Sequence, residues 1–80
     1  MKDITFNAIQ DAYQLVQGAK IKGKKHEEIF ELGAYDADKR GYTVYPFENG
    51  VIYTDFAMIM AEKELMTHYL IEVIKISKAA

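Results

Sequence analysis

The spacing of apolar side chains along this chain predicts two helices and several strands. In residues 5–17 an apolar side chain recurs at steps of three or four, which is typical of an amphipathic helix. The side chains in this stripe are Phe6, Ile9, Tyr13 and Val16. Gly18 is expected to end the helix in a left-handed conformation. A second helical pattern covers residues 56–68.

Strand-like runs and turn residues fill the remainder of the chain. The predicted strands are residues 19–22, 27–36, 42–47, 51–53 and 69–76. Pro46 lacks a backbone donor, so we expect it at the edge or the end of its strand. Asn49 and Gly50 form a strong hairpin signal. The last run is apolar almost throughout, which favours a central strand.

The predicted order of elements is helix, four strands, helix and strand (α-β-β-β-β-α-β). This order predicts an α+β fold, with a mainly antiparallel sheet of 4–5 strands packed against two helices. With 80 residues, the chain is long enough for a single domain, which we place at residues 1–80. A core this small leaves a domain only marginally stable.

The second predicted helix has apolar side chains on two nearly opposite sides. A helix that covers a sheet needs only one apolar face, so the other face either packs under another element or binds a partner. The two groups are Phe56, Ile59, Met60 and Met66 on one side, and Met58, Ala61 and Leu65 on the other. We predict a dimer or target interface at Met58, Ala61 and Leu65. Glu28 and Glu31 would form its polar rim.

Composition and charge exclude some classes of protein and leave others open. Half of the residues are apolar, which is more than a small monomer buries easily and favours self-association. The chain has no cysteine, no stretch of 18 apolar residues and no secretory leader, so we expect a cytoplasmic protein without disulfides or membrane spans. The net charge of −2 is uneven, because residues 1–26 carry five lysines and two acids, whereas residues 27–64 carry nine acids and three basic residues.

No residue pattern specifies catalysis, a metal or a cofactor. Residues 36–41 are similar to the start of a calcium loop, but Arg40 replaces a ligand oxygen and Phe47 replaces the final glutamate. His26 and His68 have no cysteine to complete a zinc set. Ser77 has no nucleophile motif around it. We therefore expect no enzyme activity, no cofactor and no metal site.

A nucleic-acid surface is an alternative interpretation of the basic residues. Lys20, Lys22, Lys24 and Lys25 would form its basic edge. Tyrosines from the sheet, at positions 35, 42, 45 and 53, could stack on bases. The acidic net charge and the lack of an aromatic RNA-binding motif count against this function. A third possibility is a small-ligand or nucleotide site at a dimer seam.

The stretch from Thr5 to Ile21 resembles, in outline only, the start of many small phage-encoded domains, some of which inhibit host defence proteins. The shared features are the predicted helix, Gly18 and the Lys20-Ile21 pair, and no functional residue is carried over. The two-sided second helix, the apolar excess and the lack of a catalytic pattern lead to our main hypothesis, a non-enzymatic protein-binding module that acts as a homo-oligomer. In its concrete form it is a phage or mobile-element inhibitor of a host protein, located in the host cytoplasm.

Overall fold

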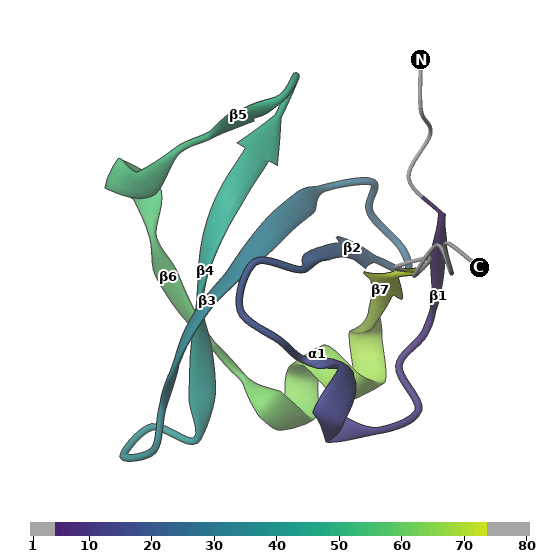
Figure 1. Cartoon of the computed structure of the whole chain (residues 1–80), viewed down its shortest axis with the longest axis vertical. Coiled ribbons are helices and arrows are strands. Elements are labelled where there is room, and N and C mark those ends of the chain that lie inside the picture. Colours follow the sequence, from purple (N-terminus) through teal and green to yellow (C-terminus); the bar gives the residue numbers. More distant parts are fainter. Residues whose placement is uncertain (1–4, 74–80) are drawn as a thin grey trace, which may run out of the picture.

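The computed structural model describes residues 5–73, which form one strongly curved antiparallel sheet and a single α-helix (Figure 1). The elements are β1 (Phe6–Ala8), η1 (Ala12–Gln14), β2 (Lys20–Gly23), β3 (Ile29–Asp36), β4 (Gly41–Glu48), β5 (Val51–Ile52), η2 (Thr54–Phe56), β6 (Met58–Ala61), α1 (Glu62–His68) and β7 (Tyr69–Glu72). The strand order is β1-β7-β2-β3-β4-β5, and β6 also pairs with β4. Strands β2, β3, β4 and β6 form a meander, and β7 then returns to pair with β2.

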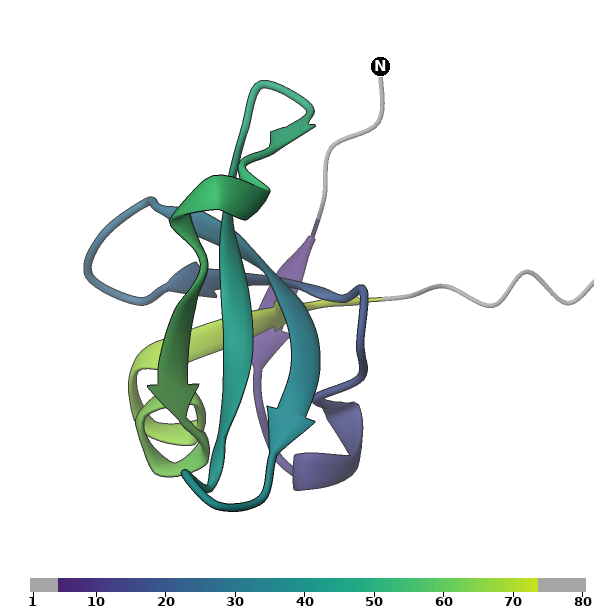
Figure 2. The same cartoon turned by 90° about the vertical axis from the view of Figure 1, so that its left-hand side faces the viewer.

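The mainly antiparallel sheet and the broad α+β class agree with the prediction, but the numbers of elements differ. Within residues 5–73, seven strands replace the expected four or five, and one α-helix replaces two. Helix α1 links β6 to β7 across the open side of the curved sheet (Figures 1 and 2). No helix in the described part of the chain is long and apolar enough to cross a membrane.

The helix predicted at residues 5–17 is wrong: this segment forms β1 and η1. Asp11 has an extended backbone, with φ −152° and ψ 140°, and its carboxylate accepts the N–H of Tyr13 at 2.9 Å. The Gln14 side chain accepts the N–H of Asp11 at 3.0 Å. Because this reciprocal capping box begins a new helical turn at Ala12, a helix cannot run through position 11.

The helix predicted at residues 56–68 is wrong in its first half. Residues 54–56 form a 3₁₀ turn, residues 58–61 form strand β6, and only Glu62–His68 are α-helical. Strand β6 lies against β4, with Tyr42 opposite Met60 and Val44 opposite Met58. The side chains that were assigned to two apolar faces of one helix therefore belong to three elements, η2, β6 and α1.

The core lies between the concave face of the sheet and α1. Its four fully buried large side chains come from β2, β3, β4 and α1, and they are Ile21, Leu32, Val44 and Leu65. Phe30 and Leu32 follow the predicted alternation on β3, and a register shift between Leu32 and Tyr35 leaves Ala34 exposed. Packing of one helix against a curved sheet thus forms a single small core.

The turn chemistry of the chain is largely as predicted. Asn49 and Gly50 have positive φ values of 54° and 79°, as a tight hairpin requires, and Gly18 has φ 96°. Pro46 lies inside β4, contrary to the prediction of a strand end or edge. The Pro46 carbonyl accepts the N–H of Tyr53 at 2.9 Å. The Pro46 nitrogen, which has no hydrogen to donate, faces the same side of β4, where the neighbouring strand changes from β6 to β5.

Strand β7 lies between β1 and β2, which confirms the predicted central strand for residues 69–72. Ile71 is buried there, opposite Ile21 of β2 and Asn7 of β1. Val73, also predicted as strand, lies just beyond the end of β7. The remaining predicted positions, residues 74–76, and Ser77 lie outside the described residues.

Candidate functional site

Large exposed apolar side chains gather on the segment from β5 to β6. Six of them fall within residues 51–59, and we call this set the apolar arm: Val51, Ile52, Tyr53, Phe56, Met58 and Ile59. Phe56 is 68% exposed, Met58 44% and Ile59 42%. The end of the β4–β5 hairpin and η2 project beyond the rest of the sheet (Figures 1 and 2). This projection keeps their side chains from reaching the core.

Strand β6 has one unpaired edge within the described residues. The N–H of Glu62 donates to the carbonyl of Arg40 at 3.1 Å. This hydrogen bond shows which residues along β6 direct their backbone groups toward β4. In an antiparallel ladder the backbone groups of alternate residues point to opposite sides. The N–H and C=O groups of Ile59 and Ala61 therefore point to the free edge.

The free edge of β6 is short, at four residues, but it lacks the other features that usually protect an edge strand. Residues 56–61 have the sequence Phe-Ala-Met-Ile-Met-Ala, without a charge or a proline. Exposed edges are normally protected by charged side chains, proline or a bulge, because their unpaired N–H and C=O groups can pair with another chain. This edge is open to strand addition.

A groove of about 930 Å³ lies between the β2–β3 loop and the β4–β5 hairpin. Phe30, Pro46 and Met58 lie on the concave side of the sheet, in register with the core residues Leu32 and Val44, and form the apolar floor. Polar residues of the loop and the hairpin tip form the rim, and they are Lys25, His26, Glu27, Glu28, Glu48 and Asn49. The groove is thus apolar at its base and mainly acidic at its rim.

The negative charge near the groove also affects a neighbouring tyrosine. The ring of Tyr69 contacts Phe30 edge-on, with 6.3 Å between centroids. Burial raises the pKa of the Tyr69 hydroxyl above 10.0, and the carboxylates of Glu64 and Glu28 raise this pKa further. Glu28 of the groove rim and Glu64 of α1 therefore both act on the Tyr69 hydroxyl.

The predicted interface residues do not form one surface. Met58 and Glu28 both line the groove, and Ala61 is exposed on β6. Leu65 is fully buried, so it belongs to the core and is not available to a partner. Glu31 lies on the convex face, where its carboxylate is 2.9 Å from the Lys20 ammonium. The set was derived from a helix that the structure does not contain.

The predicted basic edge is also divided. Lys20 is paired with Glu31, and its ammonium lies 4.9 Å from the centroid of the Phe47 ring. The Lys22 ammonium lies 5.7 Å from the Phe6 ring centroid, on the same face of the sheet. Lys24 and Lys25 are in the β2–β3 loop, and Lys25 lines the groove. Since Glu31 neutralises Lys20 locally, Lys20 and Lys22 do not act as a pair of free cations toward phosphates on this face.

The tyrosines considered for base stacking lie in separate places. Tyr35 and Tyr42 contact each other, with 4.9 Å between ring centroids. Tyr45 covers Gly33, where a Cβ atom would come within 2.8 Å of its ring. Tyr53 is part of the apolar arm. The structure does not bring the four rings together as one stacking surface.

No group of three or more histidine, cysteine or acidic side chains in residues 5–73 is placed to hold a metal ion. Comparisons with protein-family models, curated proteins and solved structures found no match. The candidate site therefore depends on the geometry of this chain alone. It comprises the apolar arm, the free edge of β6 and the adjacent groove.

Sequence reasoning missed the arm because it assigned residues 56–61 to a helix. The signal that could have found it is the β-hairpin at Asn49 and Gly50, which directs the following segment back along β4. A segment that returns in this way pairs as a strand before it can begin a helix. Met58 was predicted at an interface from the wrong secondary structure and yet lies in the arm.

Proposed function

We propose that this protein is a non-enzymatic protein-binding module that self-associates through the apolar arm and the free edge of β6. The observation that supports this proposal is the concentration of six exposed large apolar side chains in residues 51–59. Exposed large apolar side chains that gather on one segment in this way are typical of binding surfaces, whereas singly scattered ones are normal on a monomer.

A second copy of the chain suits this surface because the edge is uncharged. In an antiparallel pair across a two-fold axis, residue i faces residue j of the other copy, and only a residue on the axis meets its own counterpart. Like charges at facing positions would oppose this pairing, and a strand without any charge avoids them. Residues 56–61 contain no charge. Antiparallel pairing of β6 with its symmetry mate would satisfy the backbone groups of Ile59 and Ala61 and cover the arm.

Inhibition of a host protein by a phage protein was a more specific form of the same hypothesis. That form depended on a resemblance at residues 5–21 that includes a helix, and the structure has β1 and η1 there. The proposal is therefore made at the level of protein binding and self-association.

The test is the solution mass of the wild-type protein and of two arm variants, Phe56→Asp and Ile59→Asp, measured by light scattering after size exclusion. We expect a wild-type mass near twice 9.2 kDa and variant masses near 9.2 kDa. A charge introduced at a desolvated apolar interface is costly, so dimerisation should weaken by at least roughly a hundredfold.

The matched control is Val16→Asp, because Val16 is 45% exposed and lies outside the arm, whereas Ile59 is 42% exposed within it. Circular dichroism should show the same fold in all variants. A monomeric wild-type protein contradicts the proposal, as does an equal loss of assembly in the Val16 and Ile59 variants.

A further inference from the structure

The groove beside the arm has features of a peptide-binding site, and Met58 is the one residue of the arm that lines it. Met58 faces the concave side of the sheet, with Met60 and Val44, whereas Ile59 faces the convex side because side chains alternate along a strand. The groove floor is therefore separate from the backbone edge that would pair with a second copy.

The floor of the groove is apolar but only partly covered by the protein itself. Phe30 is buried at its base, Pro46 is half-buried, and Met58 is 44% exposed. One large apolar side chain from a ligand would remove this surface from water, and burial of such a side chain is favourable. Methionine suits such a contact because its flexible thioether adapts to different shapes.

The rim carries three carboxylates and one lysine ammonium, from Glu27, Glu28, Glu48 and Lys25. None of these carboxylates lies within salt-bridge distance of a cation in the described part of the chain, where the single ion pair joins Lys20 to Glu31. Their negative charge is thus available to a ligand. A cationic ligand would be attracted, and the phosphates of a nucleic acid would be repelled.

We propose that this groove binds an extended, lysine- or arginine-containing segment of another protein that places one large apolar side chain on Met58 and Pro46. The basic side chains that flank the apolar one would lie against Glu27 and Glu28 on the loop side and Glu48 on the hairpin side. This inference deepens the proposed protein-binding function by naming the chemistry of a partner, and it does not require the second copy.

The test uses fluorescence anisotropy with a short fluorescein-labelled peptide that alternates lysine with leucine. Two comparison peptides alternate glutamate with leucine and lysine with serine. We expect the lysine–leucine peptide to bind at least roughly tenfold more tightly than either, because one comparison lacks the charge and the other lacks the apolar side chain. Raising the ionic strength should weaken its binding, since the carboxylates are solvent-exposed.

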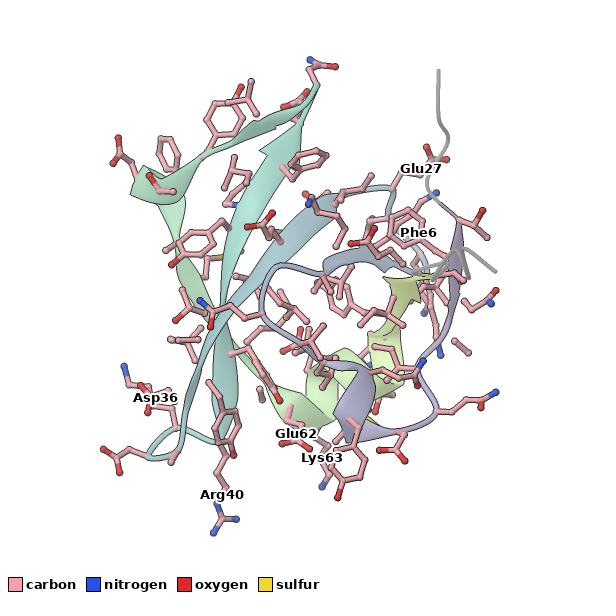
Figure 3. The ribbon with its side chains drawn as sticks, in the orientation of Figure 1. Phe6, Glu27, Asp36, Arg40, Glu62 and Lys63 are labelled. Carbon is pink, nitrogen blue, oxygen red and sulfur yellow. The ribbon has the colours of Figure 1, made fainter. Side chains whose placement is uncertain are left out.

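The decisive variant is Glu48→Lys, and the matched control is Asp38→Lys, which makes the same change of charge on another exposed residue. Asp38 lies between Asp36 and Arg40 in the β3–β4 turn, at the opposite end of the molecule from Glu27 (Figure 3). We expect Glu48→Lys to weaken peptide binding roughly fivefold and Asp38→Lys to change it less than twofold. Glu28→Lys provides a second variant on the other wall of the groove.

Three results would overturn the inference: no binding by the wild-type protein, equal binding of the glutamate–leucine peptide, or equal losses in the Glu48 and Asp38 variants. These outcomes are separable from those for self-association. If the wild-type protein dimerises but does not bind the lysine–leucine peptide, only the groove inference is contradicted. If the protein binds this peptide through Glu48 but remains monomeric, only the proposal of self-association is contradicted.

Discussion

Replacement of Gly41 by alanine tests whether β6 lies against β4, on which the apolar arm depends. Gly41 is opposite Ala61 in the ladder. A Cβ atom at position 41 would lie 2.6 Å from the carbonyl oxygen of Met60, 3.0 Å from its carbonyl carbon and 3.2 Å from the Cα of Ala61. All three atoms belong to the backbone of β6, so the overlap cannot be relieved by rotation of a side chain.

The cost of Gly41→Ala follows from two opposing effects. Overpacking in a tight core typically costs about 1–3 kcal/mol, and the backbone location of this clash places the cost near the upper end. Replacing glycine also restricts the unfolded chain, which offsets about 0.4–1 kcal/mol. We expect a net loss of about 2 kcal/mol in the free energy of unfolding. For a domain of this size, that loss lowers the melting temperature by about 8–16 °C.

The assay is urea denaturation followed by circular dichroism, since the chain has no tryptophan. Gly33→Ala is the control, because its new Cβ would come closest to the half-buried ring of Tyr45, at 2.8 Å, and this ring can rotate away. The nearest backbone atom there, the carbonyl oxygen of Thr43, would be 3.2 Å away, which requires only a small shift. Its loss of stability should be smaller than that of Gly41→Ala. If Gly41→Ala is as stable as the wild-type protein, β6 does not lie against Gly41 and residues 56–61 have another structure.

Two further predictions concern the core and the tyrosine beside the groove. Leu65→Ala should lower the free energy of unfolding by about 2–5 kcal/mol in urea denaturation because Leu65 is fully buried, and it should leave the subunit stoichiometry of the remaining folded protein unchanged. Loss of assembly without loss of stability would instead place Leu65 at an interface. Burial, followed by Glu64 and Glu28, raises the pKa of Tyr69 above 10.0 in the folded state, so stability should be full below pH 10.0 and fall as the pH rises above it. Tyr69→Phe should reduce this fall in urea titrations, and an identical fall in the variant would refute the assignment.

The strands and turns were predictable because their signals are local. Alternation at Phe30 and Leu32 gives the buried face of β3, and Asn49 and Gly50 accept the positive φ values that a tight hairpin requires. The mostly apolar run that begins at Tyr69 indicates a strand with neighbours on both sides, and β7 has them. These features depend on residues within a few positions of one another.

The two helices were wrong because a short apolar run fits both a helix and a strand. In residues 58–61 every side chain is apolar, so periodicity cannot distinguish the two, and pairing with β4 decides the outcome. In residues 5–17 a helical stripe is present, but Tyr13 from this stripe is 89% exposed. The capping box of Asp11 and Gln14 is a readable signal for a new helical start, and it outweighs the stripe.

The candidate site was only partly predictable for the same reason. Composition indicated more apolar surface than a small core buries, and the structure places much of it on the apolar arm. The location of the arm and the groove depends on tertiary pairing between β4, β5 and β6. No spacing in the sequence specifies that Glu28 and Met58 lie on the same groove.

Hydrogen exchange at the β6 amides, measured by NMR at several protein concentrations, tests self-association through this edge most directly. The amides of Met58 and Met60 face β4 and should be protected at every concentration. Those of Ile59 and Ala61 face the free edge, so we predict protection that increases with concentration and disappears in the Ile59→Asp variant. Fast exchange at Ile59 and Ala61 at all concentrations would contradict the proposed pairing.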